Sequence, residues 1–157
     1  MPLQDTIDTF KYFISQADDL DLGYICLVRY VPFLDPVIDG MAIYLAHTLL
    51  LLNVSAGQTR ATKHDVLTTY RPFVKKSALL LNGGLTPEEA NQLIAAKEID
   101  AAVFGSLWIG HPDLAKRIEH DTPLDAQLDY TTLYGPGPQA PAEQQKKGYT
   151  DYPAAHL

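Results

Sequence analysis

Hydrophobic residues follow two patterns along this chain: short continuous apolar runs, and longer stretches with apolar positions three or four residues apart. The continuous runs are rich in β formers and predict three strands, over residues 24–28, 78–81 and 99–104. The helical spacing predicts helices over residues 5–17, 62–71, from 87 onward and 112–119. Helices that alternate with strands are typical of a parallel sheet, so the expected fold class is α/β with about three parallel strands.

Residues 77–114 form the most informative stretch, because both of their predicted strands end in glycine. The first strand runs into Gly83 and Gly84, and the second into Gly105 and Ser106. Between them, Thr86, Pro87 and Glu89 give the signals of a helix start: an N-cap, a first-turn proline and a capping box. Residues 77–114 are therefore predicted to form a strand–helix–strand–helix unit.

Glycine-ended parallel strands present bare backbone N–H groups to which an anion can come close, as phosphates do at the loops after strands 7 and 8 of many (β/α)8 barrels. Glycine is also used at such turns simply because the turn geometry demands it. Spacing alone leaves both explanations open.

The run at residues 41–58 lacks the polar face that a surface helix needs. Its apolar part, residues 42–54, would span only about 20 Å as a helix, short of a bilayer core of about 30 Å, so we expect no membrane span. We expect this insertion to cover apolar surface or to pair with a second copy. It could instead be a translated intron, with Met1 an internal start.

Length, net charge and cysteine content limit which partners and which compartment are expected. A chain of 157 residues is expected to form one domain, and a net charge of −7 without basic clusters argues against nucleic acid and anionic membranes. Cys26 is the only cysteine and the N-terminus lacks a signal-peptide pattern, so a cytoplasmic setting is expected. We expect Cys26 to be buried, and His47 has no second ligand at helical spacing, so no metal site is expected.

The C-terminal region is loop-like. Residues 135–147 are expected to be a flexible loop, whereas the tail at residues 148–157 carries enough aromatic residues to fold back onto the body. His111 is predicted at the N-cap of the helix that begins near Pro112, where it is a poor cap.

Four motifs resemble the C-terminal part of the old yellow enzyme family, the FMN-dependent NAD(P)H ene-reductases built on a (β/α)8 barrel. They are L-L-N-G-G-L-T-P-E-E-A (residues 80–90), V-F-G-S-L-W-I-G-H-P-D-L (residues 103–114, where the family typically shows F-G-R-x-x-I-x-N-P-D-L), T-L-Y-G (residues 132–135) and G-Y-T-D-Y-P (residues 148–153). The resemblance implies a half-barrel made of family strands 6 to 8.

By the same resemblance, Gly83, Gly84, Gly105 and Ser106 would offer backbone N–H groups to the FMN phosphate. Leu133 and Tyr134 match the pair that packs near the flavin ring. The implied chemistry is hydride transfer from NAD(P)H to flavin and then to an electron-poor alkene.

This sequence differs from the family pattern in two ways that weaken the implied activity. The arginine that the family places after the second glycine is Ser106 here, and losing a charge-assisted hydrogen bond of roughly 1.5 to 3 kcal/mol predicts about ten- to hundredfold weaker FMN binding. Strands 1 to 5, which bring the substrate-binding pair and the proton donor, have no counterpart, so no catalytic residue is assigned.

Three interpretations follow: a half-barrel flavoprotein with weak or incomplete oxidoreductase activity, a non-catalytic truncated form that acts through protein contacts, or a binder of another phosphorylated small molecule. Open sheet edges or residues 42–54 predict a homo-oligomer, most simply a dimer.

Overall fold

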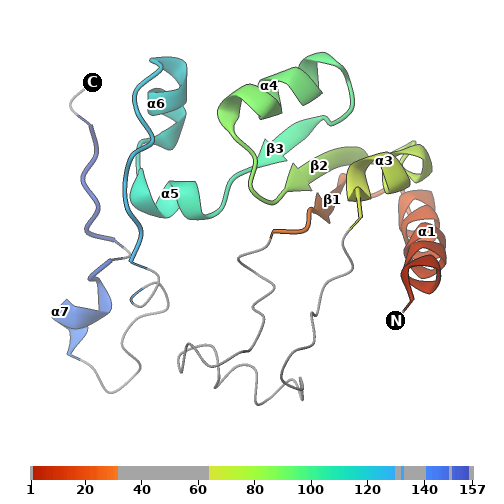
Figure 1. The fold of residues 1–157 in the computed structure, drawn as a ribbon, viewed down its shortest axis with the longest axis horizontal. Coiled ribbons are helices and arrows are strands. Elements are labelled where there is room, and N and C mark those ends of the chain that lie inside the picture. Colours follow the sequence, from red (N-terminus) through yellow and green to blue (C-terminus); the bar gives the residue numbers. More distant parts are fainter. Residues whose placement is uncertain (1, 32–63, 130–131, 133–140, 149, 156–157) are drawn as a thin grey trace. The chain divides into compact units, whose positions relative to one another are not determined.

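The computed structural model describes residues 2–31, 64–129, 132, 141–148 and 150–155 (Figure 1). The chain divides into two compact units, Met1–Val103 and Phe104–Leu157. The apolar insertion at residues 41–58, together with His47, Thr62, Leu133 and Tyr134, lies outside the described residues.

The first unit contains a three-stranded parallel sheet in the order β1-β2-β3. The strands are β1 (Tyr24–Val28), β2 (Ala78–Asn82) and β3 (Ala101–Val103). In the register, Cys26 of β1 pairs with Leu80 of β2, and Leu80 pairs with Ala101 of β3. The predicted α/β class with three parallel strands is confirmed, although β3 is shorter than the run at residues 99–104 suggested.

Helices flank this sheet, as the apolar spacing predicted. They are α1 (Leu3–Asp19), α3 (Val66–Tyr70), the 3-10 helix η2 (Arg71–Phe73) and α4 (Pro87–Ala95). Thr86 caps α4 by accepting a hydrogen bond from the Glu89 N–H, as expected. The N-cap of α3 is Asp65, whose carboxylate accepts a hydrogen bond from the Thr68 N–H.

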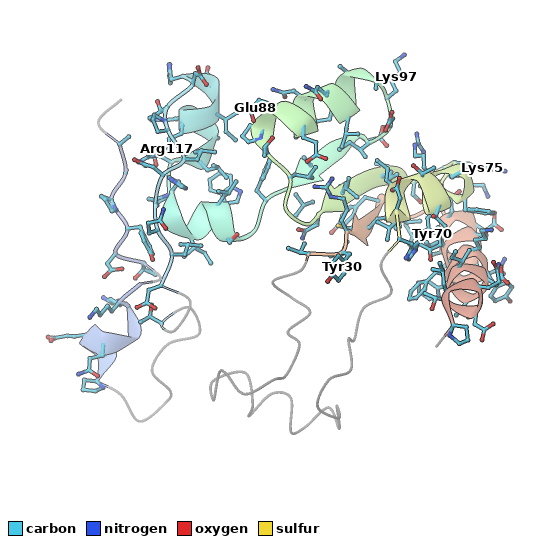
Figure 2. All side chains as sticks on the ribbon, viewed as in Figure 1. Tyr30, Tyr70, Lys75, Glu88, Lys97 and Arg117 are labelled. Atoms are coloured by element: carbon cyan, nitrogen blue, oxygen red, sulfur yellow. The ribbon has the colours of Figure 1, made fainter. Side chains whose placement is uncertain are left out.

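The core of the first unit lies between the sheet and these helices. Leu79 and Leu81 on the central strand have no exposed surface, and Ile14 of α1 and Ile99 are almost fully buried. Tyr70 lies where α3 approaches α1, with its ring 6.2 Å from that of Phe10 (Figure 2). The helices therefore bury one face of the sheet, as apolar burial requires.

The prediction that Cys26 is buried is wrong. Cys26 is exposed, and its neighbours on the same face of β1, Tyr24 and Val28, are 61% and 55% exposed. The helices cover only one face of β1, so its apolar run is buried on that face alone. On α1, Phe13 is 64% exposed, so the predicted apolar stripe is covered only in part.

A buried carboxylate fastens α1 to the strand entry. Asp18, at the end of α1, accepts backbone hydrogen bonds from Lys75, Lys76 and Ser77 at 2.8 to 3.1 Å. Burial opposes ionisation, but these bonds outweigh it and lower the pKa of Asp18 to about 2 from an ordinary 3.8. The start of β2 is thereby fixed against the end of α1.

The second unit holds α5 (Ser106–Gly110), α6 (Leu114–Glu119) and α7 (Ala142–Gln145). The helix α6 was predicted, whereas α5 is too short to show a period. The helix α7 lies within the range expected to be a flexible loop. The tail packs back as expected: the Ala155 N–H donates to Asp113 at 2.8 Å, and the Tyr152 hydroxyl donates to the Gln127 carbonyl and accepts from the Asp129 N–H.

Among the described helices, none combines the length and the apolar character that crossing a bilayer requires.

We predict that Asp18→Asn lowers the free energy of unfolding at pH 7 and makes that free energy less dependent on pH in the acid range. Because the folded pKa lies below the ordinary value, the stabilisation by Asp18 is complete above about pH 4 and is lost as the pH falls toward 2. Urea unfolding between pH 7 and pH 2 measures this. Asp19→Asn is the control, since Asp19 is exposed and pairs with the Lys76 ammonium at the surface. An equal effect of both variants would contradict the assignment.

Candidate functional site

The loop after β2 uses its two glycines for different purposes. Gly83 is buried with φ +111°, and a Cβ there would come within 3.0 Å of the Arg29 carbonyl oxygen. Gly84 is exposed with φ +65°, and a Cβ there would meet nothing within 4 Å. Gly83 is therefore required by the fold, whereas Gly84 forms the accessible part of the loop.

Arg29, directly after β1, holds this loop in place. Its Nε donates to the Gly83 carbonyl oxygen at 2.9 Å, and its two Nη atoms form a bidentate ion pair with Glu89 of α4 at 2.5 and 3.1 Å. The Arg29 N–H also donates to the Asn82 carbonyl at 2.8 Å. One side chain thus joins the end of β1, the glycine loop and the first turn of α4.

This clamp fixes the direction of a backbone donor. The Gly83 carbonyl and the Gly84 N–H belong to one peptide unit, and no described peptide bond is cis. In a planar trans peptide the C=O and N–H point in opposite directions. Because the Gly83 carbonyl points to Arg29, the Gly84 N–H points away from the clamp, on the accessible side of the loop.

The Arg29 guanidinium is already paired at the start of α4. The hydrogen bond from Arg29 lowers the pKa of Glu89, with a further contribution from the Thr86 N–H, so Glu89 stays ionised and compensates the guanidinium. Glu88 and Glu89 both lie in the first turn of α4, where they complement the positive end of the helix dipole. An anion near this loop would be held mainly by backbone N–H groups.

A hollow of about 470 Å³ has Arg29 among its lining residues. It is lined by residues of α3, α4 and the segment after β1, among them the carboxylates of Asp65, Glu89 and Glu98. Three carboxylates facing one guanidinium do not suit a phosphate. The hollow is therefore a poor candidate for the anion site that the sequence predicts.

The second predicted loop follows β3. Since β2 and β3 are parallel neighbours paired at Asn82 and Val103, their carboxyl ends lie at one edge of the sheet. Gly105 comes two residues after Val103, at the N-cap of α5, and both Gly105 and Ser106 are exposed. Gly105 has φ −101° and ψ −83°, and a Cβ there would meet nothing within 4 Å, so packing leaves room for a side chain.

His111 has a structural role in the second unit and is not the N-cap of α6, which is Asp113. The ring is 2% exposed; Nδ1 lies 3.1 Å from the Leu107 carbonyl, and Nε2 accepts the Ala126 N–H at 3.1 Å. The ring thus provides one donor and one acceptor, as the asparagine amide at the matching family position would. No catalytic role is needed to explain it.

Asp113 and Arg117 brace the same unit. Arg117 donates to Asp113 and to the Pro123 carbonyl, both at 2.9 Å, and both side chains are 11% exposed. The hydrogen bond from Arg117 lowers the pKa of Asp113. The H-P-D-L motif therefore anchors the loop after α6 and, through the Ala155 N–H, the C-terminal tail.

Leu133 and Tyr134, predicted near a flavin ring, lie outside the described residues, so the prediction stands as it was made. Within the described part of the chain, no group of three or more His, Cys, Asp or Glu side chains is arranged to hold a metal ion. Sequence reasoning missed the Arg29 clamp, because its partner Glu89 is 60 positions away.

Three parallel strands with flanking helices are the arrangement of part of an α/β barrel. Known proteins resemble this chain in sequence and in fold. The chain is 36% identical over 94 residues to 12-oxophytodienoate reductase 1 of Oryza sativa subsp. japonica, covering 60% of this chain and 22% of the relative. It is 38% identical over 87 residues to the flavin oxidoreductase hxnT of Emericella nidulans, covering 54% of this chain and 21% of the relative.

A solved structure of the old yellow enzyme homologue from Zymomonas mobilis matches 93% of this chain and 32% of its own, with 28% identity and a TM-score of 0.61. No family model matches the chain. This chain is related to the old yellow enzyme family, and its motifs place the likeness in the C-terminal part of the family's barrel. It spans about a fifth of the length of these curated relatives.

We predict that Arg29→Gln lowers the free energy of unfolding by about 1 kcal/mol, a modest value because the Arg29 and Glu89 side chains are 27% and 38% exposed. Amide hydrogen exchange at Gly84 should accelerate in the same variant. A double-mutant cycle with Glu89→Gln should give a coupling of about 0.5 to 1 kcal/mol.

The control for this cycle is Arg71→Gln, since Arg71 donates a local hydrogen bond to the Val74 carbonyl. If Arg71→Gln accelerates exchange at Gly84 as much as Arg29→Gln does, Arg29 does not hold the loop.

Proposed function

We propose that this chain is an FMN-binding half-barrel of the old yellow enzyme type, with weak or incomplete oxidoreductase activity on its own. Its relatives are named as reductases and flavin oxidoreductases, and it spans about a fifth of their length. The activity of the complete relatives is therefore part of this proposal. FMN is the proposed cofactor, NAD(P)H the proposed reductant, and the reducing cytoplasm the proposed compartment.

The phosphate of FMN is proposed to bind the backbone N–H groups at Gly83, Gly84, Gly105 and Ser106. Gly105 carries this proposal best. Its φ is negative and a Cβ would meet nothing within 4 Å, so packing does not require a glycine there. The missing side chain leaves the backbone open to the close approach of a ligand.

At the first loop, Arg29 aims the Gly84 N–H away from the ion pair with Glu89. A donor held in position before binding loses little entropy when the anion arrives. When bound, FMN would supply hydride transfer; the residues of this chain would contribute binding and orientation, including contacts from Leu133 and Tyr134 near the ring.

The replacement of the family's arginine by Ser106 sets the strength of this site. A hydroxyl can donate one neutral hydrogen bond, whereas a guanidinium would add charge-assisted bonds to a dianion. Binding of FMN is therefore expected to be weaker than in a protein that retains the arginine.

We predict that Gly105→Ala weakens FMN binding at least tenfold without lowering the thermal midpoint of unfolding. The added methyl group would lie where the phosphate approaches, while the fold has room for it. Flavin absorbance and fluorescence titrations measure the affinity, with riboflavin, which lacks the phosphate, in parallel. Gly23→Ala is the control. Gly23 too has open space at its Cβ position, but it lies before the start of β1, at the end of the sheet away from the glycine loops.

A colourless protein that ignores FMN would refute the proposal and favour the non-catalytic interpretation. Equal affinity for FMN and riboflavin would show that the phosphate loops are not used. Binding of phosphorylated ligands without flavin would favour the third interpretation.

We further predict that Ser106→Arg tightens FMN binding about ten- to hundredfold, as one charge-assisted hydrogen bond would. Riboflavin affinity should stay unchanged, because the new charge has no phosphate to meet. Parallel titrations with the two flavins at 50 and 300 mM salt measure this gain, which should shrink at the higher salt concentration. An equal gain for both flavins would place the new side chain away from the phosphate.

A further inference from the structure

One side-chain amide lies on the face of the sheet that the helices leave uncovered. Side chains alternate between the two faces along a strand, so the buried Leu79 and Leu81 of β2 lie on the helix side and residues 78, 80 and 82 on the opposite side. The register places residues 24, 26 and 28 of β1 and residues 101 and 103 of β3 on that same opposite side. We call the face formed by these residues the open sheet face.

Asn82 interrupts the apolar row at the carboxyl end of the open sheet face. In the register it lies between Val28 of β1 and Val103 of β3, the last pairs of the described sheet. Asparagine is depleted in strands, and the two valines are the kind of side chain that a strand favours there. Neither strand formation nor packing within this row therefore accounts for an amide.

The Asn82 carboxamide has no hydrogen-bond partner among the described residues, whereas its main chain is held in place. The Asn82 carbonyl accepts the Arg29 N–H at 2.8 Å, and β1 and β3 pair with this residue on its two sides. Asparagine before a turn commonly bonds the backbone N–H two residues later, but in the described chain Asn82 forms no such bond with Gly84. The partly exposed amide is therefore positioned by the sheet and open to a ligand.

The chemistry of the amide limits what that ligand can be. A carboxamide has an acceptor oxygen and two N–H donors, so it suits a hydroxyl, which donates and accepts, better than a phosphate dianion, which only accepts. Asn82 precedes Gly84 by two residues, so their Cα atoms lie at most about 7 Å apart. In FMN the hydroxyl-bearing ribityl chain is bonded directly to the phosphate, and the flavin ring lies at the other end of that chain. A phosphate held by the Gly84 N–H would bring the ribityl chain within reach of Asn82.

We propose that the Asn82 carboxamide hydrogen-bonds the ribityl hydroxyls of the bound flavin and thereby selects phosphate esters of hydroxyl-bearing chains. This assignment rests on the proposed function, because it takes the phosphate to lie at the glycine loops. It adds a side-chain contact to a phosphate site built mainly from backbone N–H groups.

Asn82→Val tests the contact, since valine is the residue on both sides of Asn82 and is well suited to a strand. In a fluorescence titration FMN should bind this variant about fivefold more weakly, the effect of one neutral hydrogen bond, while the thermal midpoint of unfolding does not fall. Asn82→Thr has nearly the shape of the valine variant but keeps a hydroxyl. It should bind FMN more tightly than Asn82→Val does.

A flavin analogue isolates the contribution of the hydroxyls. In this analogue a plain pentyl chain replaces the ribityl chain and the phosphate is retained. The wild type and Asn82→Val should bind it with equal affinity, because no hydroxyl remains for the amide to meet. Asn91→Val is the matched control: Asn91 is exposed on α4, outside the open sheet face, so this variant should bind FMN as the wild type does.

Several results would overturn this proposal and leave the proposed function standing. They are equal binding of FMN by the wild type and Asn82→Val, an equal loss of affinity for FMN and for the pentyl analogue in Asn82→Val, and an equal loss of FMN affinity in Asn82→Val and Asn91→Val. A lower thermal midpoint for Asn82→Val would show that the amide serves the fold, which also overturns the proposal. A wild type that binds no FMN overturns the proposed function and this inference with it.

Discussion

The burial of the central strand is the constraint on which the first unit depends. Leu79 and Leu81 have no exposed surface, and the helices α1, α3 and α4 flank the sheet that β2 centres (Figure 1). Burying a leucine side chain stabilises a fold by about 1.5 to 3 kcal/mol, so these two positions fix which face of the sheet meets the helices. Parallel pairing on both sides of β2 then sets the edge at which the glycine loops begin.

Two polar contacts hold the ends of the central strand. The Asp18 carboxylate positions the entry to β2, and the Arg29 guanidinium positions its exit. Each joins segments more than 50 residues apart, and each satisfies backbone groups that would otherwise lack partners. Both ends of β2, the strand that leads into the glycine loop, are therefore held in place.

The sequence was informative where local signals suffice. The continuous apolar run predicted the bounds of β1, and the Thr86-Pro87 pair predicted the start of α4, because strand propensity and capping depend on neighbours along the chain. The exposure of Cys26 could not be predicted, because it depends on which face of the sheet the helices cover. The helix α5 has five residues, too few to show a period.

Long-range contacts at the site were also beyond sequence reasoning. The pattern identified Gly83 and Gly84 but could not separate their roles, since only the approach of Arg29 makes Gly83 necessary for packing. The pair of Arg29 and Glu89 spans 60 positions with no periodic signal. His111 looked like a weak helix cap, although its ring bridges the Leu107 carbonyl and the Ala126 N–H.

The proposed function depends on binding of the FMN phosphate by backbone N–H groups of the glycine loops after β2 and β3. A ¹⁵N-correlated NMR titration of the 157-residue chain with FMN tests this binding residue by residue. We expect the Gly84 and Gly105 amide protons to shift downfield with FMN and not with riboflavin, as N–H groups that donate to a phosphate do. Shifts confined to the hollow between α3 and α4, or no shifts at either glycine under saturating FMN, would contradict it.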